Sequence, residues 1–437
     1  MKNKLEAKKD TIVYPLFTEY FMKKRIISAL LLIAVICSLS SCILIDGVNL
    51  GLGTTQTQPA GDTYVTVEKV EEIDGITINS NYSPNILAAT KALLSAVSIA
   101  CKFEKLTSSG YKEGYSSGSG VIFSLDKAKG EAYVLTNYHV VYDENANTKN
   151  RISDEISLFL YGQEYADYAI PATYVGGSMQ YDLAVLKVSG SQVLIESNAV
   201  AAEFADSDKV SVLDIAIAVG NPEGESLSAT VGYVNVDSEE IDNPALSGQS
   251  ATQDSLGTLR VMRIDAAVNH GNSGGGLFND KGQLIGIVNA KIVDDSVDNI
   301  GYAIPSNVAK YIAENILYYC NGKDNEYVKR CMLGISIQVS EASTDFDKET
   351  GRLTKVEKVK IVSLTDKSAA KGILKENDII NSLTLDGKKY EITRLYHVTD
   401  VMLNARPGST VIFNVTRDGV TTDVTMVATE AMLTVYK

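Results

Sequence analysis

Short apolar segments separated by Gly, Asn and Asp dominate the chain after residue 118. Residues 120–123 form one such segment, a turn sequence follows at 126–130, and a second apolar segment occupies 133–135. Apolar runs of this length, bounded by turn residues, are typical of β-strands joined by hairpins. The pattern therefore predicts a mostly β domain whose first hairpin leads directly into residues 136–141.

Two segments have helical periodicity instead. Residues 88–98 predict a short helix at the start of the folded region, and residues 306–319 place Val308, Ile312 and Ile316 four apart on one face. Ser306 is the predicted cap of the second helix. A turn-rich break at 321–325 follows, and a new β pattern begins at Met332.

The length of 437 residues exceeds one comfortable core and predicts two or three units. We place the first folded domain at residues 89–325 and the second at residues 326–437.

The N-terminus has the order of an export signal. The basic residues 23–25 precede an apolar stretch at 26–39, and Ser40, Ser41 and Cys42 follow. The apolar stretch is short for a spanning helix, which needs about 20 residues. An uncleaved signal anchor is the alternative, since residues 43–45 extend the apolar run. We expect a signal peptide at 1–42 and a flexible tether at 43–88, with the rest outside the cytoplasm.

Charge and cysteine content exclude several classes of protein. The net charge of −14 leaves no broad basic surface, so nucleic acid is not an expected partner. The five cysteines contain no C-x-x-C pair, which argues against a zinc ribbon or a thioredoxin-like redox motif. No metal or other cofactor is expected. Cys320 and Cys331 could form a disulfide or remain free thiols, and the sequence leaves both open.

Three residues in the β region carry the elements of nucleophilic catalysis. His139 follows the first hairpin, Asp182 stands at the start of the apolar strand 183–188, and Ser273 lies in the run Gly271-Asn272-Ser273-Gly274-Gly275. The chemistry needs a hydroxyl to attack, an imidazole to take its proton and a carboxylate to orient the imidazole. Glycines beside the serine allow successive backbone N–H groups to point at one spot, so Gly271 and Ser273 are the expected oxyanion donors.

Each of these residues also has a structural interpretation. His139 could be a satisfied core histidine, Asp182 could cap a turn, and Ser273 could belong to a flexible connector. The three types in this order favour the catalytic interpretation. His270, three residues before Ser273, is expected to face solvent, although it could alter the pH profile.

Together these residues resemble the HtrA (DegP-type) branch of the trypsin-like fold. The resemblance rests on Thr-Asn-x-His-Val-Val around His139, Asp-Leu-Ala-Val-Leu-Lys from Asp182 and Gly-Asn-Ser-Gly-Gly around Ser273. It implies a double six-stranded β-barrel and a serine endopeptidase that degrades misfolded or exposed polypeptides in protein quality control. It also implies a homotrimer and a preference for small aliphatic residues.

The second domain resembles a PDZ domain, a small β-sandwich with helices. The motifs that carry the resemblance are at 332–335, 368–373, 376–380 and 406–409. PDZ domains add a peptide to a sheet edge and hold its C-terminal carboxylate with loop N–H groups. The resemblance assigns Leu333, Gly334 and Ile335 to that loop, and a small β module that only packs against the protease is the alternative.

Residues 39–42, Leu-Ser-Ser-Cys, resemble the lipobox of bacterial lipoproteins. This resemblance implies cleavage before Cys42, a lipid on its sulfur, and anchoring to the outer face of a bacterial cell membrane.

The alternative to a serine endopeptidase, from another class of function, is a peptide-binding chaperone in which proteolysis is latent or off.

Overall fold

The computed structural model describes residues 71–73, 76–78, 84–107, 110–163, 166–242, 258–290, 300–321 and 326–436. The predicted signal peptide and its lipid site, Cys42, lie outside these residues. No helix in the described ranges is both long and apolar enough to cross a membrane.

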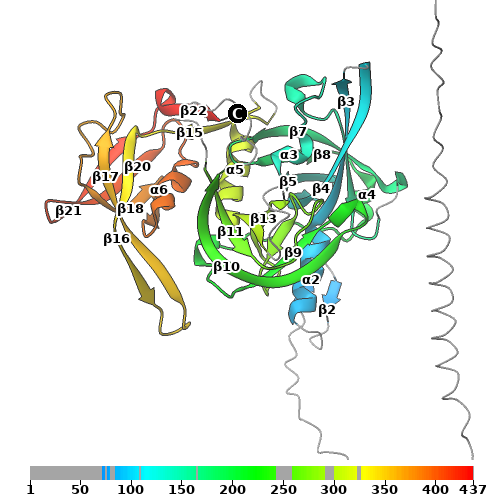
Figure 1. Cartoon of the computed structure of the whole chain (residues 1–437), viewed down its shortest axis with the longest axis horizontal. Helices are drawn as coiled ribbons and strands as arrows, with labels where there is room; N and C mark the ends of the chain where they lie inside the picture. The colour runs from blue at the N-terminus through cyan, green and yellow to red at the C-terminus, as the bar shows by residue number, and fades with distance from the viewer. Residues whose placement is uncertain are drawn as a thin grey trace, which may run out of the picture. The chain divides into compact units, whose positions relative to one another are not determined.

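The first of two closed barrels holds the predicted hairpin. Its strands are β3 (Ala96–Thr107), β4 (Gly110–Asp126), β5 (Glu131–Thr136), β6 (Glu155–Leu160), β7 (Ile170–Ser178) and β8 (Leu183–Val188). They close in the order β3-β4-β5-β8-β7-β6 (Figure 1). Alternate side chains fill the interior, among them Ile99, Ile122 and Leu186, which are fully buried.

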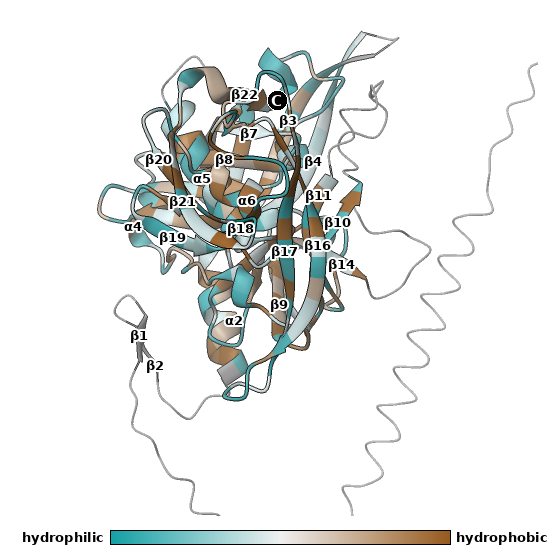
Figure 2. Cartoon of the chain, turned by 90° about the vertical axis from the view of Figure 1, so that its left-hand side faces the viewer, coloured by the Kyte–Doolittle hydropathy of each residue, from teal (hydrophilic) through white to brown (hydrophobic). Residues whose placement is uncertain are grey.

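The second barrel repeats this architecture. Its strands are β9 (Ile215–Gly220), β10 (Ser228–Asp242), β11 (Thr258–Ile264), β12 (Gly276–Phe278), β13 (Leu284–Val288) and β14 (Gly301–Pro305). They close in the order β10-β11-β14-β13-β12-β9. Hydrophobic positions concentrate on the strands rather than on the connecting loops (Figure 2). The prediction of a mostly β protein with two six-stranded barrels is confirmed.

Helices close the ends of this region. Helix α2 (Pro84–Ser95) buries Ala88 and Ala92, and helix α5 (Ser306–Tyr319) buries the predicted apolar face of Val308, Ile312 and Ile316. Two short helices, α3 (Tyr138–Val141) and α4 (Gln192–Glu196), lie in connections, and β1 (Glu71–Ile73) pairs with β2 (Ile76–Ile78).

The predicted cap of α5 is wrong. Pro305 occupies the N-cap position and Ser306 is already the first helical residue. The Ser306 side chain is fully buried, and its hydroxyl donates to the Ala205 carbonyl at 2.8 Å. The Ser306 hydroxyl, which the local pattern assigned to capping the helix, therefore bonds to a distant segment of the chain instead.

The C-terminal region forms a separate sheet and core. The strands β16 (Ile335–Phe346), β17 (Leu353–Leu364), β18 (Ile379–Leu385), β20 (Thr410–Arg417) and β21 (Val420–Val427) follow one another in the sheet, and β19 (Lys388–Glu391) pairs with β18. Helix α6 (Leu395–Met402) covers a core that includes Ile361 and Phe413. Strands β15 (Val328–Cys331) and β22 (Leu433–Tyr436) form a further antiparallel pair.

The cysteines in the described ranges are buried and form no disulfide. They are Cys101, Cys320 and Cys331, so the disulfide left open by the sequence is not formed. Burial raises the pKa of the Cys101 thiol to about 12 and that of Cys331 to about 11. Both thiols stay protonated at neutral pH, which makes them poor nucleophiles.

Candidate active site

His139 and Asp182 are held together by two contacts. His139 Nδ1 lies 2.7 Å from Asp182 Oδ2, and the His139 backbone N–H donates to Asp182 Oδ1 at 3.0 Å. The short helix α3 after β5 provides both groups of the histidine, and the turn before β8 provides the carboxylate. A proton on Nδ1 leaves Nε2 as the acceptor, which is the tautomer that a general base requires.

Asp182 is almost fully buried, at 1% exposure, in a left-handed backbone conformation with φ of 47°. Asp tolerates this conformation better than most residues. Asn137 fixes the backbone there, since its side-chain amide donates to the Asp182 carbonyl at 2.8 Å. Burying a carboxylate costs free energy unless hydrogen-bond donors surround it, so Asp182 requires such donors.

Asn289 supplies a donor that the sequence analysis missed. Its Nδ2 lies 2.8 Å from Asp182 Oδ2, and its own backbone N–H donates to the Tyr302 carbonyl at 2.8 Å. Asn289 is fully buried directly after the apolar strand β13. A buried polar residue at the end of such a strand was the available signal, but no spacing linked it to Asp182.

Ser273 lies in the loop between β11 and β12 and is 6% exposed. Ser119 fixes the loop twice: its hydroxyl donates to the Gly271 carbonyl at 2.8 Å, and its backbone N–H donates to the Ser273 carbonyl at 2.8 Å. The first barrel therefore holds the serine loop of the second.

Glycine is required at two positions of this loop. Gly271 has φ of 95°, and a Cβ there would lie 2.1 Å from the Asn221 carbonyl oxygen. Gly274 has φ of 82°, and a Cβ there would lie 2.3 Å from Thr136 Oγ1. Both conformations are open to glycine at little cost.

The serine loop packs against the segment that carries the base. A Cβ on Gly274 would also lie 2.9 Å from the backbone nitrogen of Asn137, two residues before His139. Among the described residues, however, Ser273 Oγ has no hydrogen-bond partner within 3.5 Å, His139 included. Such bonds are often long in unliganded enzymes and tighten when substrate binds.

The two expected oxyanion donors have free N–H groups. Within the described ranges, neither the Gly271 nor the Ser273 backbone N–H has a protein acceptor. The neighbouring His270 carbonyl accepts from the Glu223 N–H at 2.8 Å, and the imidazole of His270 is exposed, as expected. Because C=O and N–H point in opposite directions across a trans peptide, the Gly271 N–H faces away from Glu223.

Comparisons with known proteins agree with this architecture. The family model of the trypsin-like peptidase domain matches residues 118–287, and that of the PDZ domain matches residues 331–427. Serine protease Do-like HtrA of Bacillus subtilis is 34% identical over 310 residues, which are 69% of this chain and 61% of that protein. The chain is thus similar to HtrA-type serine proteases over its two barrels and its C-terminal domain.

Other relatives support the same conclusion. Periplasmic pH-dependent serine endoprotease DegQ of Escherichia coli is 33% identical over 305 residues, covering 69% of this chain and 57% of DegQ. The match thus spans less than two thirds of these curated relatives. A solved structure titled HtrA-type protease AlgW with tripeptide superposes with a TM-score of 0.50 at 26% identity, covering 81% of this chain and 98% of that one.

The predicted peptide-binding loop of this chain lies directly before β16. Leu333 and Gly334 connect β15 to β16, and Ile335 begins the strand. Gly334 has φ of 70°, and the Leu333 carbonyl accepts from the Ser368 hydroxyl at 2.8 Å. No acceptor within the described ranges binds the N–H groups of Leu333 and Gly334.

The described residues contain no group of three or more His, Cys, Asp or Glu side chains arranged to hold a metal ion.

Proposed function

We propose that this chain is a serine endopeptidase in which Ser273 is the nucleophile, His139 the general base and Asp182 the residue that orients it. The observation that carries the proposal is the Asp182 carboxylate, which is buried and accepts from both His139 and Asn289. This arrangement holds the carboxylate against the Nδ1 edge of the imidazole and leaves Nε2 available to accept a proton.

The reaction proceeds through an acyl-enzyme. Ser273 Oγ attacks the peptide carbonyl carbon and its proton passes to His139 Nε2. The Gly271 and Ser273 N–H groups stabilise the oxyanion, each by about 3 kcal/mol, as judged from donor deletions in other proteases. The C–N bond then breaks as His139 returns the proton to the leaving amine, and water hydrolyses the ester by the same route.

The C-terminal domain contributes peptide recognition. The N–H groups of Leu333 and Gly334 would hold a C-terminal carboxylate, and the start of β16, with Ile335 and Ile337 packed on the domain core, would pair with the peptide. The substrates of this proposal are misfolded or exposed polypeptides, as in protein quality control.

The full proposed organisation follows the sequence-based boundaries. Residues 1–42 form the signal peptide, 43–88 a tether, 89–325 the protease domain and 326–437 the PDZ domain. The location is extracytoplasmic, which the periplasmic relative DegQ supports. Anchoring to the outer face of a bacterial membrane through a lipid on Cys42 or an uncleaved signal anchor, and a homotrimer, complete the proposal.

A peptide-binding chaperone with latent proteolysis is the second candidate. One observation favours it: Ser273 Oγ and His139 are not hydrogen-bonded. The two functions separate when the purified chain and its Ser273→Ala variant are incubated with an unfolded protein. The protease proposal expects fragments only with wild type, whereas equal persistence of the substrate in both would support the chaperone.

A further inference from the structure

Strand β16 is the outermost strand of its sheet and is unusually long for an edge. It spans 12 residues, and within the described part of the chain only β17 pairs with it along its length. Residues 338–346 are all exposed. An edge strand presents a row of unpaired N–H and C=O groups to solvent, which is a template for a further strand.

This edge has only part of the usual protection against pairing, since its charged side chains are two carboxylates, Glu341 and Asp345. Natural edges are kept short or carry Lys or Pro, whereas residues 335–346 contain neither Lys, Arg nor Pro. The pairing of β16 with β17 shifts register twice, between residues 336 and 337 and between residues 339 and 341, both in the first half of β16. From Glu341 to Phe346 the register with β17 is unbroken, so this half offers regular extended backbone.

The second half of β16 belongs to a ribbon that extends past the body of the sheet. Strand β17 pairs with β18 only at Val359 and Lys360, so residues 341–358 have no third strand beside them (Figure 1). A two-stranded ribbon alone is marginal in water. This ribbon therefore needs contacts outside its own two strands to keep its position.

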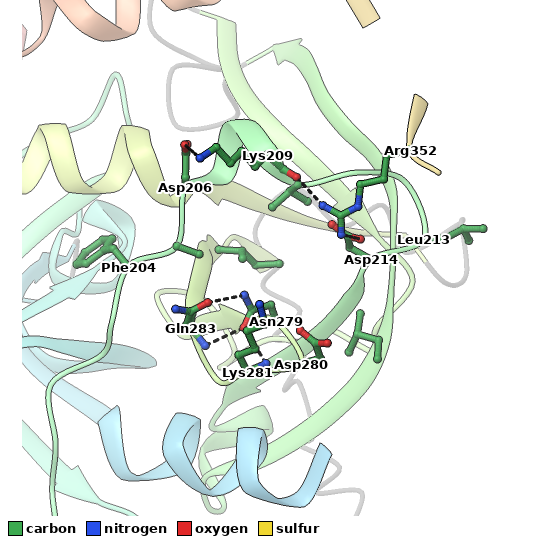
Figure 3. A pocket seen from close by; sticks show the side chains of 14 residues that line it. Phe204, Asp206, Lys209, Leu213, Asp214, Asn279, Asp280, Lys281, Gln283 and Arg352 are labelled. Carbon is green, nitrogen blue, oxygen red and sulfur yellow. Dashed lines mark hydrogen bonds and ion pairs between the residues drawn. The ribbon is translucent and has the colours of Figure 1, made fainter. Parts of the chain in front are cut away.

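Arg352, at the tip of the ribbon, provides the attachment. Its Nη2 lies 2.6 Å from Asp214 Oδ1, and its Nη1 donates to the Lys209 carbonyl at 3.1 Å. Both acceptors belong to the loop before β9 of the second barrel, beside a cavity of about 520 Å³ (Figure 3). The tip of the ribbon is thus tied to the protease domain.

The two ends of β16 therefore have different neighbours. Its first residue adjoins the free N–H groups of Leu333 and Gly334, and its last residue adjoins the tip tied to the second barrel. A peptide whose C-terminal carboxylate is held at Gly334 must run antiparallel to β16. Its upstream residues would then follow the ribbon toward the protease domain.

We propose that the PDZ domain binds a polypeptide tail of about ten residues as a continuous added strand along the whole of β16, rather than only its last few residues. The proposal rests on the proposed peptide-binding function of this domain. The ligand is an unstructured C-terminal tail with a hydrophobic end. Recognition upstream is through backbone groups, because β16 offers mostly small or uncharged side chains there.

The test compares fluorescent peptides of about five and about twelve residues that share one hydrophobic C-terminus, bound to the full chain carrying Ser273→Ala. The longer peptide should bind at least about tenfold more tightly, since its upstream residues add backbone hydrogen bonds to β16. N-methylation of alternate upstream amides should abolish that gain in one register. Equal affinities, no binding of either peptide, or a gain insensitive to N-methylation in both registers would overturn the proposal.

The Arg352 attachment gives an independent test. In Arg352→Ala the gain from upstream residues should fall while the affinity of the short peptide stays unchanged. Lys348→Ala, in the same turn, is the matched control and should behave as wild type. A long-peptide gain that survives Arg352→Ala would refute the role of the attachment.

Failure of this proposal would be distinct from failure of the proposed function. If the wild-type chain hydrolyses unfolded protein through Ser273 but both peptides bind the Ser273→Ala variant with equal affinity, the protease function stands and only the extended added strand is refuted.

Discussion

Asn289 Nδ2 and His139 Nδ1 share one oxygen of Asp182, at 2.8 and 2.7 Å. The shared oxygen makes Asn289 a positioning residue, because it acts on the base only through the carboxylate. The two residues come from different barrels, so this contact also ties the halves of the site together.

Replacing Asn289 by Leu should lower kcat by about ten- to hundredfold, because a hydrogen bond to a buried charge contributes about 1.5–3 kcal/mol. KM for a short peptide should change little, since Asn289 is fully buried. Asn289→Thr, which keeps a donor, should recover part of the rate, and the surface variant Asn147→Ala is the control. Equal kcat for the Leu and Thr variants would argue that packing alone matters.

Gly271→Ala tests the oxyanion loop. The added Cβ would meet the Asn221 carbonyl oxygen at 2.1 Å, so the loop must move and the Gly271 N–H with it. We expect kcat to fall by at least about hundredfold, the usual effect of losing one oxyanion donor. Gly408→Ala is a matched control, because Gly408 has φ of 94° with nothing within 4 Å of its Cβ position. Comparable activity of both variants would contradict the assigned donor.

Arg260, whose guanidinium is buried, joins the two domains through an ion cluster. Its guanidinium pairs with Asp208 at 2.8 Å and with Asp400 of α6, and it stacks 3.4 Å from the centre of the Tyr396 ring. Arg260→Met should destabilise the chain by about 3 kcal/mol, because the partly buried carboxylates of Asp208 and Asp400 lose their buried partner. Adding Asp400→Asn should restore part of that loss. Arg263→Met, half-exposed on the same strand, is the control, and equal melting temperatures for both single variants would contradict this account.

The Asp378–Arg417 pair gives a pH prediction. Asp378 is fully buried, which by itself raises its pKa, but bonds from Arg417 at 2.6 and 2.7 Å hold the pKa below its usual value of 3.8. The pair therefore stabilises the folded state above pH 4, and this contribution is lost as the pH falls through the folded-state pKa.

Denaturant unfolding should accordingly show Asp378→Asn to be less stable than wild type by about 3 kcal/mol at pH 7. The difference should shrink as the pH falls below 4. Asp366→Asn, fully exposed in the same domain, should have almost no effect at either pH. A difference that stays constant from pH 7 to pH 3 would show that the ionised pair is not its cause.

The sequence predicted the strands around His139 and Ser273 because short apolar runs and turn residues are local signals. Asp182 was predictable for the same reason, as a charge at the start of an apolar strand. Asn289 was not, since its link to Asp182 spans 107 positions and depends on barrel closure. Ser306 was assigned to the wrong partner because the Ala205 carbonyl lies about a hundred positions away, and Arg260 met Asp400 only through packing of the domains.

Labelling by a fluorophosphonate tests the central claim most directly, because this reagent phosphonylates a serine only where a base and oxyanion donors activate it. The purified chain should carry one adduct, located by peptide mass on Ser273. The adduct should disappear in His139→Ala and after denaturation. An unlabelled Ser273 in the native chain, or labelling that persists in His139→Ala, would contradict the assignment of this residue as the activated nucleophile.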